Sequence, residues 1–387
     1  MTVLHTRAVM LMVLVSPITL ADAIQSQSRG LIEDSTWNVI NRTVYDRRDY
    51  QHGARNSGAR NAYKPKAERN GYAEEWAYGL MATLQSGFTQ GLIGVGVDAH
   101  AYQGVKLDSG GGRAGKARLL GLDNEGYPKD NFSRGGAALK LRMSNTVVSY
   151  GEQRVKTPVF SSSDSRLLPE TATGVFAVSH EFADLKMVGG HFTESTDRNA
   201  SSHNQGFVVN YSNALKGDAF DLAGVVYTPR KNFSASLYTS RYENTWNQHY
   251  LGAIFSQAID AKRALTFNFN LYRTTNEGKA LSGSIDNTTW SALSTYAQGP
   301  HSVSLGYQKV HGSTPFDYVT RGAIFITNAV QLSDFNAPNE QSWQARYDLD
   351  MSPWGLPGLM FSAAYVRGSD IDGSHVDPRG GYAYLGY

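Results

Sequence analysis

The feature of this sequence that most limits its fold is a two-residue alternation of apolar and polar side chains. In residues 75–85, Trp76, Leu80 and Leu84 would share one face, while Glu75 and Gln85 would share the other. The same division recurs in residues 93–102, 137–144, 265–272 and 342–350. Successive side chains of a strand point to opposite faces, whereas a helix would mix the two sets. The alternation therefore predicts an all-β antiparallel protein.

The connections between these segments distinguish a membrane barrel from a soluble β-sandwich, which also alternates. Short connections are expected at 86–91, near 145, and at 182–185, 228–232, 258–264, 298–301 and 352–358. Longer connections are expected between them, at 46–71, 103–135, 154–173, 193–220, 243–248, 274–287 and 310–341. Short turns on one side and long loops on the other are typical of outer-membrane barrels. The sequence therefore predicts a transmembrane antiparallel β-barrel.

The N-terminus has the pattern of a secretory signal peptide. A weakly basic start is followed by an apolar run over 8–15 and by Ala21-Asp22-Ala23. A transmembrane helix needs about 20 apolar residues, and Ser16 and Pro17 interrupt this run much earlier. We therefore expect residues 1–23 to be a signal peptide cleaved after Ala23, and residues 24–387 to form the barrel domain in the bacterial outer membrane.

Composition excludes several classes of function. The chain has no cysteine, which excludes disulfides, thiolate zinc sites and cysteine nucleophiles. Its 36 basic and 34 acidic residues leave a net charge of +2, whereas a nucleic-acid binder usually carries a strongly basic domain. Neither a G-x-S-x-G nor an H-E-x-x-H motif is present. We therefore expect no enzyme, no cofactor, no metal site and no nucleic-acid partner.

About fifteen strands are expected, the last over residues 358–367. Bacterial single-chain barrels have even strand numbers, because the first strand pairs with the last in antiparallel fashion. A fifteenth strand would end on the outer side and leave Tyr387 in an extracellular loop. The odd number indicates that either the count is off by one or the barrel is incomplete at its C-terminus.

Motifs over most of the chain resemble those of the OprD family of outer-membrane porins, substrate-selective channels for carboxylates and basic amino acids. They include EWA at 75–77, QSGFTQG at 85–91, SDSRLLPET at 163–171, SDFN at 333–336, SWQARYD at 342–348 and GLPGL at 355–359. The resemblance implies an eighteen-stranded barrel, often trimeric, with a channel narrowed by the third loop and helped by the seventh. The chain departs from the family at its end, where the family continues with about three more strands.

Basic residues near strand centres are expected to point into the lumen. A Lys or Arg facing lipid at the bilayer midplane costs about 2–4 kcal/mol. Strand parity selects Lys140, Arg142 and Arg346, and less directly Arg42 and Lys186. This basic wall resembles the ladder of arginines and lysines by which the family guides carboxylates. The alternative for Arg42 and Lys186 is a solvated position at the aqueous rim.

Charges of both signs are expected near the constriction. Asp164, Arg166 and Glu170 belong to the third-loop motif, and either contact solutes or form a salt bridge that fixes the loop to the wall. Asp317 and Tyr318 resemble the seventh-loop segment that offers an acidic group to the ammonium of a solute. A zwitterion would then meet bases on the wall and an acid at the loop.

Asp98 and His100 share one face of a predicted strand. We expect the two to be ordinary polar residues of the lumen rather than a metal-binding or catalytic pair. The sequence predicts a porin for selective passive diffusion of small zwitterionic or carboxylate solutes, such as basic amino acids and small peptides. A surface receptor or adhesin, or a barrel hydrolase, are the alternatives. Outer-membrane lipid and lipopolysaccharide are the expected surroundings, and the basic loop 55–69 either binds lipopolysaccharide phosphates or is a solvated face.

Overall fold

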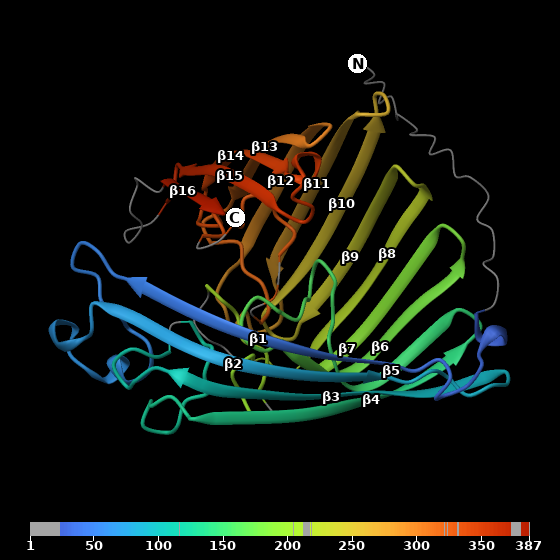
Figure 1. Cartoon of the computed structure of the whole chain (residues 1–387), viewed down its shortest axis with the longest axis horizontal. Coiled ribbons are helices and arrows are strands. Elements are labelled where there is room, and N and C mark those ends of the chain that lie inside the picture. The colour runs from blue at the N-terminus through green and yellow to red at the C-terminus, as the bar shows by residue number, and fades with distance from the viewer. Residues whose placement is uncertain are drawn as a thin grey trace, which may run out of the picture.

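The computed structural model describes residues 24–115, 117–203, 205–211, 217, 219–320, 322, 324–330, 333–372 and 381–386. The expected signal peptide, residues 1–23, lies outside the described residues. The described chain forms one antiparallel sheet of sixteen strands in sequence order, each hydrogen-bonded to its neighbours in the chain. The strands turn progressively from β1 to β16, so the sheet curves round (Figure 1). Within the described residues, β1 and β16 are its two edges.

The strands, with four short 3-10 turns, make up the regular structure of the described chain. Their bounds are β1 Thr36–Asp49, β2 Tyr72–Gln85, β3 Ile93–Asp108, β4 Asn131–Met143, β5 Thr146–Gln153, β6 Thr171–Phe182, β7 Leu185–Thr196, β8 Phe220–Arg230, β9 Phe233–Tyr242, β10 Trp246–Ala258, β11 Arg263–Asn276, β12 Asp286–Gln298, β13 His301–His311, β14 Gln341–Asp350, β15 Met360–Ser369 and β16 Gly381–Gly386. The 3-10 turns are η1 Gln25–Gln27, η2 Ala59–Tyr63, η3 Lys66–Glu68 and η4 Ser352–Trp354. In the part of the chain that the structure describes, no helix has the length and apolarity needed to span a membrane.

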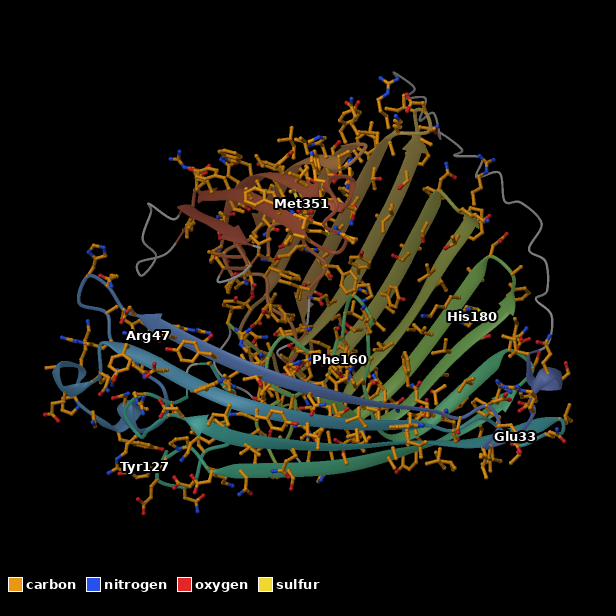
Figure 2. The ribbon with its side chains drawn as sticks, viewed as in Figure 1. Glu33, Arg47, Tyr127, Phe160, His180 and Met351 are labelled. Carbon is orange, nitrogen blue, oxygen red and sulfur yellow. The ribbon has the colours of Figure 1, made fainter. Side chains whose placement is uncertain are left out.

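The alternation that the sequence predicts is present in the sheet. Along β2, Trp76, Leu80 and Leu84 are exposed, whereas Ala77 and Met81 are buried. The expected short connections form one rim, at 86–92, 144–145, 183–184, 231–232, 259–262, 299–300 and 351–359. The other rim carries the connections 50–71, 109–130, 154–170, 197–219, 243–245, 277–285, 312–340 and 370–380. Figure 2 shows the two rims, with Glu33 and His180 at the first and Arg47 and Tyr127 at the second.

Sixteen strands are one more than the fifteen expected. The additional strand is β16, which pairs with β15 from Arg367↔Gly381 to Ser362↔Gly386. Residues 381–386 were expected to lie in an extracellular loop, and this expectation was wrong, whereas Tyr387 lies outside the described residues. Six residues are too few for an alternation to be recognised, because the signal of each barrel strand is weak.

The largest core cluster lies between the inner face of the sheet and the long connections that fold onto it. Phe160, from the third long connection (154–170), is its centre. Its ring centroid lies 5.2, 5.7 and 5.0 Å from those of Phe192, Phe207 and Phe220, and Figure 2 shows it within the curve of the sheet. Aromatic pairs of this kind contribute about 0.5–1.5 kcal/mol beyond the area they bury. Apolar packing therefore holds the third connection inside the sheet.

Candidate functional site

The third connection (154–170) crosses the interior and is held to the wall by strands far apart in the sheet. On β2, Gly79 lies against Leu167, since a Cβ there would be 3.1 Å from the Leu167 side chain and 3.2 Å from its carbonyl oxygen. On β11, the Tyr272 hydroxyl donates to the Pro158 carbonyl at 3.0 Å. The buried Arg134 of β4 donates to the Pro169 carbonyl. The connection is therefore fixed near both of its ends.

Asp164 joins two arginines at the exposed edge of this connection. Its two carboxylate oxygens accept from Arg42 of β1 at 2.8 Å and from Arg154 at 3.0 Å. Arg42 also donates to the carbonyls of Arg166, at 2.6 Å, and of Leu167, at 3.4 Å. These contacts favour the loop-fixing alternative for Asp164, and they place Arg42 against the third connection rather than at the aqueous rim.

The other two predicted residues of this motif differ in exposure. Arg166 is half-buried and donates to the Ser165 carbonyl at 2.9 Å. Glu170 is buried, and its carboxylate accepts from the Ser163 backbone N–H at 2.9 Å. Of the two, Arg166 is therefore the better placed to meet a solute.

The seventh connection (312–340) contains the predicted pair Asp317 and Tyr318. Asp317 is only 4% exposed. Its carboxylate accepts from the backbone N–H groups of Asn210 and Tyr318, at 2.9 and 2.8 Å, and from that of Tyr211 at 3.1 Å. These three donors favour a structural role for the carboxylate, because those of Asn210 and Tyr211 tie the fourth connection (197–219) to the seventh.

Tyr318 donates its hydroxyl to Asp334 at 2.8 Å, and Tyr211 donates to the same Asp334 oxygen at 2.5 Å. Burial and the neighbouring Asp334 carboxylate raise the pKa of the Tyr318 hydroxyl well above its ordinary value. The hydroxyl therefore stays a protonated donor across the neutral range. Asp334 is half-buried. Both hydrogen bonds go to one of its two carboxylate oxygens, Oδ2.

The third and seventh connections touch each other. The Thr320 hydroxyl donates to the Ser161 carbonyl at 3.5 Å. Gly322 approaches the same carbonyl so closely that a Cβ at this position would lie 1.9 Å from the Ser161 oxygen. A glycine is therefore required here by contact between two backbones. The two loops that the family resemblance assigns to the channel thus form one unit.

Lys140 and Arg142, predicted to form the basic wall, face inward on β4. Lys140 forms a 2.5 Å ion pair with Asp98 and donates to the Ser86 carbonyl at 3.2 Å. Arg142 donates to the Gln25 side chain at 2.7 Å and lies 4.1 Å from the centre of the Phe88 ring. Both side chains therefore contact the first short connection, and Arg142 also binds the segment after residue 23. Strand parity could not reveal these contacts.

The remaining predicted wall residues lie on other strands. Arg346 donates to Asp348 on the same strand, at 2.7–2.9 Å, so the two charges balance. Lys186 is half-buried and shares the inward face of β7 with Val188 and Phe192.

His100 is stacked on Tyr102, with ring centroids 4.6 Å apart, and lies 3.5 Å from the Glu152 carboxylate. Asp98, the predicted neighbour of His100, is paired with Lys140 instead. Over the described residues, no group of three or more His, Asp and Glu side chains is arranged to hold a metal ion.

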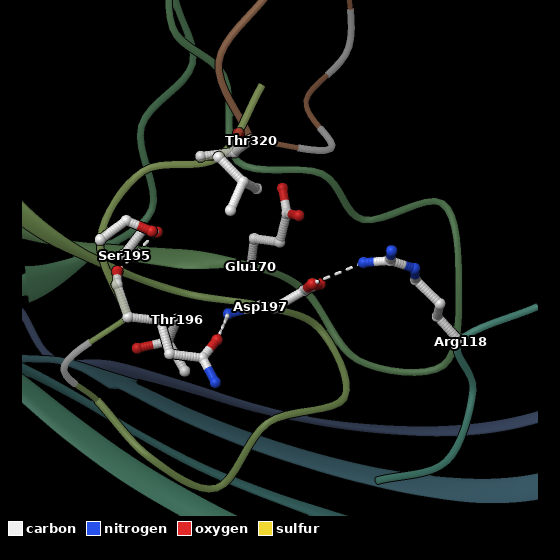
Figure 3. A pocket seen from close by; sticks show the side chains of 9 residues that line it. Arg118, Glu170, Ser195, Thr196, Asp197 and Thr320 are labelled. Carbon is white, nitrogen blue, oxygen red and sulfur yellow. Dashed lines mark hydrogen bonds and ion pairs between the residues drawn. The ribbon is translucent and has the colours of Figure 1, made fainter. Parts of the chain in front are cut away.

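Four connections meet around a cavity of about 210 Å³. Arg118 of the second connection and Glu170 of the third line it together with Asp197 at the start of the fourth and Thr320 of the seventh. Arg118 and Asp197 form a 3.1 Å ion pair across it (Figure 3). The cavity is large enough for several ordered waters. The cavity is lined by charges of both signs, and Glu170, the last residue of the third connection, is one of them.

Sequence reasoning missed several residues of the interior. Arg134 and Glu152 are buried strand residues that bond the third and fourth connections: Arg134 donates to the Ala200 carbonyl at 3.2 Å, and His203 lies 2.8 Å from Glu152. Arg154 and Asp334 lie in the connections. Strand parity applied to residues 131–143 would have placed Arg134 on the inner face. For Glu152, Arg154 and Asp334, the sequence carries no signal that identifies their partners.

Together, the curved antiparallel sheet, its apolar outer face and its inward-folded polar connections define an outer-membrane β-barrel channel. The family model described as outer membrane porin, OprD family, matches residues 29–383. The chain belongs to the OprD family of bacterial outer-membrane porins.

Individual relatives agree with this assignment. Porin D of Pseudomonas aeruginosa is 40% identical over 373 residues, covering 94% of this chain and 80% of the relative. The porin-like protein GalP of Pseudomonas putida is 30% identical over 361 residues, covering 92% and 83%. Among solved structures, Pseudomonas aeruginosa OccK9 (OpdG) is 30% identical with a TM-score of 0.82, covering 90% of this chain and 87% of that one. The expected fold class, an all-β outer-membrane barrel, is confirmed.

Proposed function

We propose that this porin allows selective passive diffusion of small solutes that carry a carboxylate, including zwitterionic amino acids and small peptides. The observation that carries the proposal is the pairing of Arg42 and Arg154 with the single carboxylate of Asp164 on the inward-folded third connection. Two cations share one anion there, and Arg166 adds a third cation next to it. A pore selects by its width and by the charges that line it. An excess of positive charge at the folded-in loop favours carboxylates.

The acid for an ammonium group is assigned to Asp334 rather than to Asp317. Asp317 is engaged by three backbone N–H groups in a buried site. Asp334 is half-buried, and both of the hydrogen bonds from Tyr211 and Tyr318 go to one of its oxygens. Its other oxygen is the better candidate for a solute ammonium.

The relatives support the class of solute. One solved structure that this chain resembles is Pseudomonas aeruginosa OpdK with vanillate, with a TM-score of 0.77 and 30% identity over 88% of this chain and 84% of that one. Vanillate is an aromatic carboxylate. The relatives are porins by name, which favours the porin interpretation over an adhesin or a hydrolase. Trimer formation and signal-peptide cleavage stay predictions.

Liposome swelling tests the proposal. Purified protein is reconstituted and swelling rates are compared for an amino acid, a small carboxylate and a neutral sugar of similar size. We expect Arg166→Ala to slow the carboxylate relative to the sugar, and Asp334→Asn to slow arginine. Arg55→Ala, at an exposed arginine of the first long connection, is the matched control. Equal rates for carboxylate and sugar in the unmodified protein would contradict the selectivity and leave a general pore.

A further inference from the structure

The outer face of β11, β12 and β13 carries a polar row where these strands meet their short connections. Arg263, Gln298 and His301 are register partners, so they lie side by side across three strands. All three are exposed. The strands carry apolar or aromatic side chains two residues further along, at Leu265, Tyr296 and Val303. Successive rows on one face lie about 7 Å apart, so hydrogen-bond donors stand directly beside the apolar surface.

Aromatic hydroxyls link the two rows. Tyr296 donates to Gln298 at 3.1 Å, and Tyr347 lies 2.7 Å from His301 Nδ1. Trp354, which is 54% exposed, lies 6.2 Å from the His301 ring. Tyr and Trp with one polar and one apolar side are typical of the membrane–water interface. The row therefore lies at the level of lipid headgroups on the side of the short connections.

A groove opens at the end of this row. It has a volume of about 550 Å³ and is lined by residues 260–263 and 298–301. The two connections are joined by a 2.8 Å hydrogen bond from the Gly299 N–H to the Lys262 carbonyl. The groove is large enough for a phosphate headgroup, and its apolar continuation on Val303 and Leu305, 47% and 62% exposed, could hold acyl chains.

The charge around the groove is positive. Lys262 and Arg263 lie in it. The same rim carries Arg230 at the end of β8 and Lys231 in the neighbouring short connection, which is bonded to β10 between Asn232 and Ser256. Asp260 is the carboxylate of this groove, and its two oxygens accept from the backbone and side chain of Arg263 and from the backbone of Lys262. A headgroup ammonium would find this carboxylate engaged.

We propose that this groove binds the phosphodiester headgroup of an anionic phospholipid without an ammonium, such as phosphatidylglycerol, in the periplasmic leaflet of the outer membrane. Lys262 would bind the phosphate, with Arg263, which is ion-paired with Asp260, as a second and weaker contact. Gln298 and His301 would bind the glycerol hydroxyls, and the acyl chains would lie on the apolar rows. The proposal rests on the outer-membrane position of the chain and is independent of the solutes that pass through it.

Native mass spectrometry of the full chain in detergent tests it. Dioleoyl phosphatidylglycerol and dioleoyl phosphatidylcholine are titrated into separate samples of the protein. We expect clear preference for phosphatidylglycerol, a loss of about fivefold in affinity in Lys262→Gln, and a further but smaller loss in Lys262→Gln with Arg263→Gln, because Arg263 is ion-paired with Asp260. Lys64→Gln with Lys66→Gln, on the opposite rim, is the control and keeps the preference.

Three further measurements make the result decisive. Heat-modifiable migration shows that each variant is folded, and if the double variant is not, the single Lys262→Gln variant decides. Inorganic phosphate in tenfold excess should leave the lipid bound, and its displacing the lipid would indicate a free-phosphate site. Equal binding of the two lipids would overturn the proposal. So would a Lys262→Gln variant with unchanged affinity for phosphatidylglycerol, or the binding of a second protein copy in place of lipid.

Discussion

Arg42 of β1 donates a 2.8 Å hydrogen bond to Asp164, 122 residues further along the chain. Because Arg154 binds the other oxygen of the same carboxylate, Asp164 holds together an arginine of the first strand and one that follows β5. The ion pair is only partly exposed. It both fixes the third connection (154–170) and sets how much positive charge that connection presents.

Replacing Asp164 with Asn should shift the channel towards anions. One negative charge disappears while Arg42 and Arg154 remain, and a unit charge at about 4 Å is worth about 1 kcal/mol in water-like surroundings, or about fivefold in preference. The reversal potential across a salt gradient measures this shift. Asp49→Asn, a charge at the rim paired with Arg47 at 3.6 Å, should leave the potential almost unchanged.

Replacing Asp317 with Ala should cost stability, about 3 kcal/mol, because three part-buried N–H groups lose their acceptor. Heat-modifiable migration followed against temperature gives the change. Asp123→Ala, whose backbone partners Glu125 and Tyr127 lie in its own connection, is the control and should have the smaller effect. If the Asp317→Ala variant instead kept full stability and lost only the passage of ammonium-bearing solutes, Asp317 would be the solute contact after all.

Replacing Gly322 with Ala should separate the third and seventh connections. The new Cβ would lie 1.9 Å from the Ser161 carbonyl oxygen, so one of the two backbones must move. We expect a changed single-channel conductance and a reduced preference for carboxylates. Gly189→Ala on β7 meets nothing within 4 Å and should behave as the unmodified channel does.

The free energy of unfolding should fall at alkaline pH because the Tyr318 hydroxyl loses its proton. Burial raises the pKa of its hydroxyl in the folded state above the ordinary value of 10.0. The stability that this hydroxyl contributes is therefore fully present below pH 10 and is lost as the pH rises towards the folded pKa. The thermal midpoint should fall as the pH rises above 10, and Tyr318→Phe should lower the midpoint at pH 8 while weakening this fall. Equal alkaline falls in both proteins would contradict the assignment.

Most of the strands could be predicted from the sequence, because alternation and turn residues are local signals, whereas the short β16 could not. Parity also placed Lys140, Arg142 and Arg346 on the inner face. Strand parity, however, predicts on which face of the sheet a residue lies, but not which residues it contacts. The partners of these residues, such as Gln25 for Arg142 and the N–H groups of Asn210 and Tyr211 for Asp317, are brought close by folded-in connections. Such contacts depend on loop paths that no periodic pattern encodes.

The third connection is bonded to β1 through Arg42 and to β11 through Tyr272. Both β1 and β11 must therefore be in place before the third connection can make these two contacts. A sheet in which β11 has not yet joined lacks the Tyr272 anchor. The position of this connection is therefore a property of the assembled sheet rather than of its own segment.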